Sequence, residues 1–236
     1  MSPAELAERV RAQLAAAADP AHRDGVRWFF KETVDPYGVR SPQVHKIAAE
    51  AHKVLRHWPV ARRNSFCREL WKSGKMEEGA VAIHVYRRFR KQCAACEFQL
   101  FEKWIDRYVR NWAHCDGVAS WLVAAAIGNE PELIPLLSAW TGSHNRWKRR
   151  AAAVSLLQEA KQGRHTREIL QIADALLNDP DDMVLKGAGW LLKETYPKKP
   201  RDVVRFLSAR RGTAPRLAVR IAAEKMPPQV RAGVLR

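Results

Sequence analysis

Apolar residues recur every three or four positions along almost the whole chain, and no other feature constrains its fold as strongly. The stretches 47–55, 81–89, 133–140 and 154–160 show this spacing clearly. Side chains three and four residues apart lie on one face of an α-helix, whereas a half-buried strand needs strict alternation. The chain contains no convincing alternating segment. The sequence therefore predicts an all-α protein.

Short turns marked by Pro, Gly or Asn separate the expected helices. Ser41-Pro42 is typical of a helix start, and the acid-rich segment 178–182 indicates a turn that leads into another helix. Similar helix pairs return about every 40 residues, the loose spacing of HEAT-type repeats. Stacked pairs of this kind form a curved solenoid with a concave face. We therefore expect residues 1–236 to form one domain, a right-handed superhelical solenoid of HEAT-like antiparallel helix pairs.

The chain is strongly basic. It carries 41 Lys and Arg against 25 Asp and Glu, so its formal net charge is +16 over 236 residues. Such a charge disfavours a compact state through self-repulsion, and a bound polyanion would offset it. Nucleic acid fits better than a membrane surface, because no strongly amphipathic anchor helix stands out. A concave basic face has the shape that cradles a duplex. The alternative is a generally basic protein with no such partner.

The remaining composition argues against several classes of protein. With 47% hydrophobic residues the chain can bury a sizeable core, so intrinsic disorder is not expected. The longest apolar run, Trp121–Ile127, is far shorter than the roughly 18 residues of a membrane span. We see no apolar signal-peptide segment and too few cysteines for a disulfide framework. Cys93 and Cys96 form a single Cys-x-x-Cys pair, so no zinc site is expected. These features favour a cytoplasmic protein.

The first candidate site is the segment 111–116, Asn-Trp-Ala-His-Cys-Asp. If Asn111 caps the helix that follows, Trp112 and Asp116 are four residues apart and share one helix face. A carboxylate beside an indole face suits a cationic ligand or a cationic transition state. The alternative is that Trp112 packs in the core and Asp116 is a solvent-exposed acid near the helix start.

Four cations cluster at another expected helix N-terminus: Arg146, Lys148, Arg149 and Arg150. The helix dipole disfavours positive charge there, and a bound phosphate would reverse that cost. Arg150 lies on the apolar stripe of its helix, so it should point inward or toward a groove. The other three can face solvent, and for Lys148 a simple solvent-exposed role fits equally well.

Two glycines inside a third expected helix, Gly187 and Gly189, precede Trp190. A glycine in a helix costs about 1 kcal/mol relative to alanine. The pattern therefore indicates close approach by a neighbouring helix or a ligand. Trp190 is then either a packing residue or a platform at the surface. No strand precedes these glycines and no third glycine follows, so the segment is not a dinucleotide-binding loop.

Taken together, these motifs resemble the AlkD-type DNA alkylation repair glycosylases, which are built from HEAT-like helical repeats. The resemblance runs nearly end to end, and it depends on the order and intervals of short motifs. These are Arg27-Trp28-Phe29-Phe30, Tyr37-Gly38-Val39-Arg40-Ser41-Pro42, Arg68-Glu69-Leu70-Trp71, Trp112 to Asp116, Trp147 to Arg150, Gly189 to Glu194 and Asp202-Val203-Val204.

The resemblance implies a DNA glycosylase that hydrolyses the N-glycosidic bond of N3- or N7-alkylated purines, such as 3-methyladenine and 7-methylguanine, in duplex DNA. By position, Asp116 would be the catalytic carboxylate. Trp112 and Trp190 would be aromatic walls at the lesion sugar, and Arg150 would hold the nearby backbone phosphate. Such enzymes are thought to grip the backbone without enclosing the base, and this sequence has no obvious base-reading constellation.

The family also uses an aromatic residue near the N-terminus, and two positions compete for this role. The spacing back from Gly38 selects Phe29, whereas the preceding Arg selects Trp28. At either position the tyrosine hydroxyl of the family is absent. We therefore expect Trp28 or Phe29 to contact the DNA.

Contacts with phosphates would supply most of the affinity, with steep salt dependence and little sequence preference. The basic segments offer the donors Arg146, Lys148, Arg149, Arg150, Lys186 and Lys193, with a further group at Arg87, Arg88, Arg90 and Lys91. We expect a monomer that needs no metal or cofactor and whose partner is duplex DNA with alkylated bases. The rival hypothesis is a non-catalytic HEAT-like module that binds DNA or RNA, or a protein scaffold, in which Asp116 is dispensable.

Overall fold

The computed structural model describes residues 1–235, and every regular element in that range is a helix. Extended pairing among the described residues is limited to one isolated parallel bridge between Asp35 and Lys75. The prediction of an all-α protein is therefore confirmed. Within the described range, no helix combines the length and the apolar content that a membrane crossing requires.

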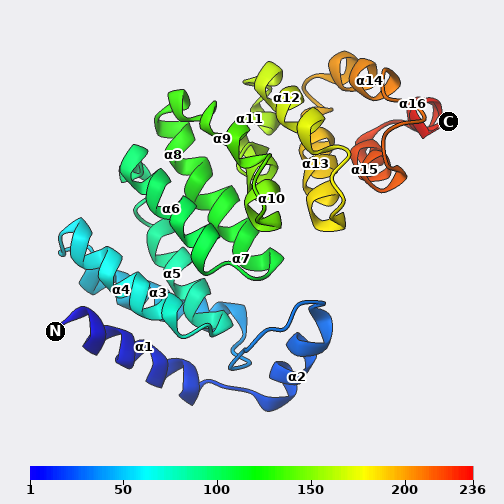
Figure 1. Cartoon of the computed structure of the whole chain (residues 1–236). Helices are drawn as coiled ribbons and strands as arrows, with labels where there is room; N and C mark the ends of the chain where they lie inside the picture. Colours follow the sequence, from blue (N-terminus) through cyan, green and yellow to red (C-terminus); the bar gives the residue numbers. More distant parts are fainter. Residues whose placement is uncertain (236) are drawn as a thin grey trace. The chain divides into compact units, whose positions relative to one another are not determined.

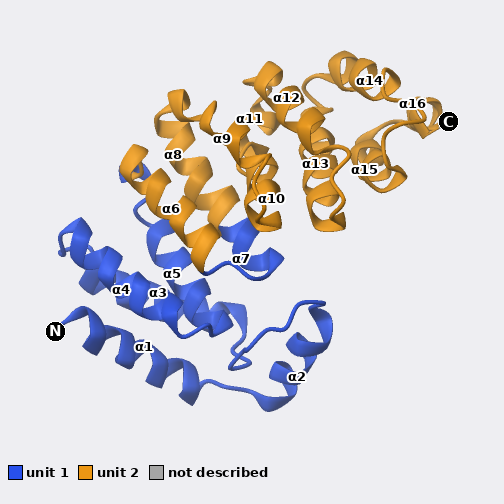
Figure 2. Ribbon diagram, viewed as in Figure 1, with its two compact units in different colours: residues 1–92, 108–117 blue, residues 93–107, 118–236 orange. Residues whose placement is uncertain are grey.

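The helices group into two compact units, which Figure 2 shows in blue and orange. Unit 1 consists of Met1–Gln92 and Tyr108–Gly117, and unit 2 consists of Cys93–Arg107 and the chain from Val118 onward. The segment 93–107 therefore leaves unit 1, and the next ten residues return to it. That the whole chain acts as a single solenoid domain stays a prediction.

Unit 1 contains six α-helices and one short 3₁₀ helix among its described residues (Figure 1). They are α1 (Pro3–Ala16), α2 (Pro20–Phe29), α3 (Ser41–Leu55), α4 (Val60–Lys72), α5 (Met76–Arg87), η1 (Arg90–Gln92) and α7 (Trp112–Gly117).

Unit 2 contains the remaining helices, of which η2 is a π-helical segment and η3 and η4 are 3₁₀ turns. They are α6 (Ala95–Arg107), η2 (Val118–Val123), α8 (Ala124–Asn129), η3 (Pro131–Leu133), α9 (Leu136–Trp140), α10 (Arg146–Val154), α11 (Leu157–Gln162), α12 (Thr166–Leu176), α13 (Asp182–Thr195), α14 (Pro200–Ser208), α15 (Arg216–Ala222), η4 (Ala223–Lys225) and α16 (Pro228–Leu235).

The core of unit 1 follows the apolar stripes of α1, α3, α4 and α5. Ile47, Ala51 and Leu55 of α3 are buried, as their spacing predicts, and α3 packs against α5. In α1, Leu6, Ala7, Val10 and Leu14 are buried and form one helix face. Burial of these apolar faces is the main term that stabilises such a unit.

Helix α2 differs from its neighbours because none of its residues is buried. Its start is tied to the loop before α3, since the Asp19 backbone N–H donates to the Gly38 carbonyl at 3.3 Å. Gly38 has φ of 90°, and a Cβ at this position would lie 2.3 Å from the Asp19 carbonyl oxygen. Only glycine fits both the backbone angle and the close approach.

The loop that carries Gly38 is in turn fixed by a buried carboxylate on α5. Glu77 is 6% exposed and accepts hydrogen bonds from the backbone N–H groups of Tyr37, Gly38 and Val39 at 2.8, 2.8 and 2.9 Å. The next residue, Glu78, is fully buried and accepts a hydrogen bond from the Tyr37 hydroxyl. Two adjacent acids of α5 thus hold the connection between α2 and α3.

In unit 2, α13 packs against both α10 and α15. A Cβ on Gly189 would lie 2.7 Å from the Ala218 carbonyl oxygen of α15, closer than real Cβ atoms come. A Cβ on Gly187 would lie 3.3 Å from the Arg150 side chain of α10. Both glycines therefore serve close packing, which confirms the expectation that a neighbouring helix approaches them.

Gly189→Ala is expected to destabilise the protein by about 1–3 kcal/mol, because the new methyl group overpacks the contact between α13 and α15. Gly128→Ala is the matched control, since a Cβ there meets nothing within 4 Å. Urea denaturation should show a lower midpoint for the first variant and an unchanged or higher midpoint for the second. Equal midpoints would contradict the packing argument.

Candidate functional site

Asn111 positions the helix that carries Trp112 and Asp116. Its side-chain oxygen accepts a hydrogen bond from the His114 backbone N–H at 2.9 Å, which is the N-cap that the sequence predicts for α7. Helix α7 ends at Gly117, where the π-helical segment η2 begins. Trp112 and Asp116 still lie one turn apart on the same short helix, and both are partly buried.

His114 joins α7 to the start of α5. The side chain is 6% exposed, and its Nε2 lies 2.8 Å from the Met76 carbonyl oxygen. Its Nδ1 lies 3.3 Å from the Asn111 amide nitrogen. These contacts fit a neutral ring that donates from Nε2 and accepts at Nδ1. Burial lowers the pKa of His114, although the Met76 carbonyl and the charge of Glu77 oppose this shift.

Trp112 lies in an aromatic cluster with the end of α2. Its ring is stacked on Phe30, with 5.2 Å between ring centroids and 14° between planes. Phe29 contacts Trp112 edge-on at 6.0 Å, and 63% of Phe29 is exposed. Trp28 is 88% exposed. Of the two aromatic residues named from the sequence, Phe29 therefore joins Trp112, and Phe30 is the residue that sequence reasoning missed.

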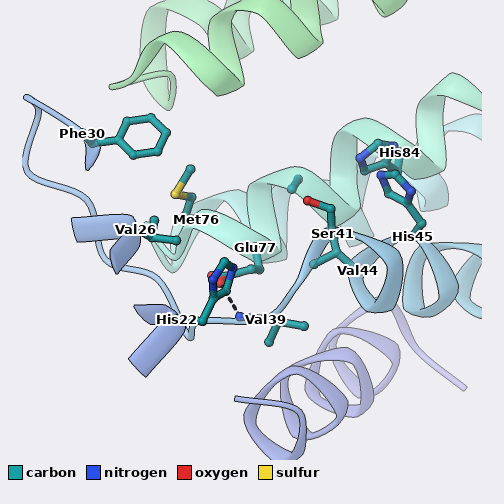
Figure 3. A pocket seen from close by; sticks show the side chains of 11 residues that line it. His22, Val26, Phe30, Val39, Ser41, Val44, His45, Met76, Glu77 and His84 are labelled. Atoms are coloured by element: carbon teal, nitrogen blue, oxygen red, sulfur yellow. Dashed lines mark hydrogen bonds between the residues drawn. The ribbon is translucent and has the colours of Figure 1, made fainter. Parts of the chain in front are cut away.

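Phe30 also lines a pocket of about 160 Å³ within unit 1. Figure 3 shows Phe30 and Met76 at one end of this pocket and His45 and His84 at the other. Between them, the Glu77 carboxylate faces the pocket while it binds the loop backbone. The aromatic cluster therefore borders a partly polar cavity that the sequence analysis did not predict.

Arg150 and Trp190 lie in unit 2, on α10 and α13. Arg150 is 5% exposed, which confirms that it points inward, and its guanidinium donates to the Met183 carbonyl at the start of α13. Trp190 is partly exposed and hydrogen-bonds Glu194 one turn later. The two residues thus belong to one pair of packed helices. Their convergence with Trp112 and Asp116 of unit 1 stays a prediction.

Three cations of α10, Arg146, Lys148 and Arg149, have carboxylate partners within unit 2. Arg149 forms a bidentate pair with Asp179 at 2.6 and 3.0 Å. The other predicted phosphate donors with ion pairs are Arg146 with Asp181, Lys148 with Glu102 and Asp106, and Lys193 with Glu224. These acids offset the cost of placing cations at a helix N-terminus. The sequence analysis had expected a bound phosphate to do so. Lys186 forms no ion pair with any described residue.

The described residues offer no evident metal centre, because no three His, Cys, Asp or Glu side chains among them are grouped to share an ion. Cys93 and Cys115 are buried, and Cys96 is exposed. Unit 1 places a carboxylate, Asp116, on the same helix as Trp112 of the aromatic cluster. Such a set can stabilise positive charge and exclude water from one side of it.

Lowering the pH from 7 to 5 is expected to lower the melting temperature. Burial, together with the positive charges of Arg87 and Arg88 and with His45, lowers the pKa of His84 to about 4. An unfolded histidine has a pKa of about 6.5, so between these values the unfolded state binds a proton that the folded state does not. His84 therefore contributes full stability above about pH 6.5 and loses it progressively toward pH 4.

The melting temperature of His84→Asn should accordingly depend less steeply on pH between 5 and 7 than that of the wild type. His144→Asn is the control, because His144 is exposed. Calorimetry at several pH values measures both slopes. An unchanged slope for His84→Asn would show that His84 does not titrate in this window.

Comparison with known proteins places the chain in a family. The family model for DNA alkylation repair enzymes matches residues 10–226. A solved structure described as a predicted DNA alkylation repair enzyme from Enterococcus faecalis superposes with a TM-score of 0.81 at 16% identity, covering 89% of this chain and 97% of the other. The smu.31 protein from Streptococcus mutans superposes with a TM-score of 0.60 at 14% identity, covering 78% and 100%.

At these identities the structural matches show a shared fold. A search of curated proteins found no match. The family model itself covers most of the sequence, and it agrees with the helical architecture described above. The chain therefore belongs to the family of DNA alkylation repair enzymes.

Proposed function

We propose that this protein is a DNA glycosylase that releases cationic N3- or N7-alkylated purines, such as 3-methyladenine and 7-methylguanine, from duplex DNA. The observation that carries the proposal is the stack of Trp112 on Phe30, with Asp116 one turn further along α7. Membership of the alkylation repair family supports the same reading. The net charge of +16 supports DNA as the partner.

The proposed reaction needs a negatively charged carboxylate, and it needs no general acid to protonate the departing base. An N7- or N3-alkylated purine already carries a positive charge, so it departs as a neutral base when the glycosidic bond breaks with its electron pair. The sugar then gains oxocarbenium character, which the Asp116 carboxylate stabilises. Water adds to the C1′ carbon and gives its proton to Asp116, which returns it to solvent. The same division of work is known for carboxylates in glycoside hydrolysis.

The aromatic cluster would stabilise the same positive charge on the sugar. An indole face attracts cations, and the sugar C–H groups become more positive as the bond breaks. Phe30 holds the Trp112 ring from behind, so the indole presents one fixed face. We infer that Trp190 supplies a second aromatic wall and Arg150 a phosphate contact, once a solenoid of HEAT-like helix pairs brings both units around a duplex. In this proposal the chain works as a monomer on a concave basic face.

The ion pairs of unit 2 affect how strongly its cations would bind the DNA backbone. Arg149 and Lys148 are already held by carboxylates, so a phosphate must compete with Asp179, Glu102 and Asp106. Lys186 needs no such exchange. We therefore expect the paired cations to fix the register of α10 and to bind DNA weakly.

Asp116→Asn is expected to reduce base release by at least 100-fold, roughly 2.7 kcal/mol of transition-state stabilisation, because the amide keeps the shape but removes the charge. DNA binding should stay within about twofold. The measurement is release of free 7-methylguanine and 3-methyladenine from methylated duplex DNA under single turnover. Glu132→Gln, which removes an exposed acid of η3, is the matched control.

Two outcomes would count against the enzyme. Full activity of Asp116→Asn would remove this residue from the chemistry. No release by the wild type, with salt-sensitive DNA binding retained, would leave a DNA-binding helical protein in place of the glycosylase.

Phe30→Leu is expected to lower the single-turnover rate of base release about tenfold, because the Trp112 ring loses its stacking partner. Trp28→Leu removes a more exposed aromatic ring two residues away and should leave this rate near that of the wild type. Any effect of Trp28→Leu should be on DNA affinity. Equal rate losses in both variants would show that the stack on Trp112 has no special role.

A further inference from the structure

Two segments of unit 1 carry many cations and no acid. Residues 51–68 contain five Lys and Arg, and residues 79–92 contain four, with neither Asp nor Glu in either range. Residues 133–158 also hold four cations and no acid, but three of these, Arg146, Lys148 and Arg149, form ion pairs with acids of other segments. A run without acids cannot neutralise itself locally, so its charge is balanced by acids of other segments, by solvent ions or by a ligand.

These segments meet at the ring of Phe89, which follows α5. The Arg63 guanidinium of α4 lies 4.1 Å from the centroid of this ring, and the His52 ring of α3 lies 4.8 Å from it. Arg63 also donates to the Gln92 side chain at 3.1 Å. The end of α3, the first half of α4 and the end of α5 therefore converge on one place.

Arg63 is a buried cation in this region, and its charge is only partly compensated. It is 8% exposed, it forms no ion pair with any described residue, and its Nε–H has no hydrogen-bond acceptor. Burying a charge is costly unless an opposite charge or several hydrogen bonds compensate it. The partners of Arg63 are the Gln92 amide oxygen and the face of the Phe89 ring, and neither carries a negative charge.

Two exposed arginines surround this buried one. Arg56 caps the end of α3 and Arg88 caps the end of α5, and neither forms an ion pair with a described residue. The pKa of His52 is lowered by burial and then by the charges of Arg88, Arg56 and Arg63. The geometry agrees, since Arg88 precedes Phe89, Arg63 lies over the Phe89 ring, and Arg56 follows His52 by one turn of α3. We call the three arginines the Arg56–Arg63–Arg88 patch.

We propose that the Arg56–Arg63–Arg88 patch binds the phosphodiester backbone of duplex DNA at a second position, away from the reacting base. Guanidinium groups bind phosphate oxygens in pairs, and three of them from three helix ends can follow consecutive phosphates. The inference rests on the proposed function for its choice of polyanion. A membrane bearing anionic lipid headgroups is the alternative that the test must separate.

The position of the patch explains what it would contribute. Helix α5 has 12 residues and is therefore about 18 Å long. Its start is tied to α7 through the bond between His114 and Met76, and the patch lies at its other end. A phosphate held there cannot touch the reaction, so the patch adds affinity and salt dependence without changing the rate of bond cleavage. It would keep the protein on undamaged DNA between lesions.

The test compares Arg56→Gln/Arg88→Gln with the control Arg9→Gln/Lys46→Gln. Both double variants remove two exposed charges from unit 1, and both leave the buried Arg63 in place. Fluorescence anisotropy of an undamaged duplex over a range of KCl concentrations gives the slope of log Kd against log salt. The first variant should lose roughly 1.8 from this slope, about 0.9 for each lost phosphate contact, and bind at least tenfold more weakly at low salt. The control should keep the wild-type slope.

Equal slopes for the two double variants would overturn the proposal. So would a loss of binding to phosphatidylserine vesicles in the patch variant with DNA binding unchanged. Thermal melting by circular dichroism checks that both variants fold. Single-turnover base release with excess protein should be the same for the patch variant and the wild type. If the wild type releases no base, the glycosylase proposal fails while the slopes still decide the role of the patch.

Discussion

The hydrogen bond between the His114 ring and the Met76 carbonyl links two positions that are 38 residues apart, and the arrangement of unit 1 follows from it. It sets the start of α7 against the start of α5, and this fixes where Trp112 lies. One residue after Met76, Glu77 holds the loop of Gly38, and that loop holds the start of α2. The aromatic cluster therefore depends on a neutral buried histidine that follows Trp112 by two residues on the same short helix.

The two units differ in whether carboxylates balance their positive charges. In unit 2 the cations of α10 are matched by acids from α6 and from the turn before α13, so they act as cross-links between helices. In unit 1, Arg56, Arg63 and Arg88 form no ion pair with a described residue. The net charge thus describes neither unit well. What distinguishes a binding surface from a basic surface is the absence of internal carboxylate partners, and only three-dimensional placement reveals it.

Local patterns predicted the helices well and the site in part. The cap by Asn111, the inward direction of Arg150 and the packing role of Gly189 depend on short-range chemistry, and the structure confirms them. Phe30 could not be found in this way. It ends α2 in an extended conformation with ψ of 135°, so its ring leaves the helical face that spacing describes. Pairs such as Arg149 with Asp179, 30 residues apart, likewise depend on how distant helices pack.

Helix α2 buries none of its residues, and this has a consequence for local unfolding. With no buried residue to cover them, its backbone hydrogen bonds are close to solvent, and the contacts of Asp19 with Gly38 and of Phe30 with Trp112 hold its two ends. The free energy needed to open such a segment is far below that of the core helices. Amide protons of α2 should therefore exchange with solvent long before those of α3 or α5. A ligand that clamps Phe30 against Trp112 would slow that exchange, so protection of α2 reports on occupancy of the aromatic cluster.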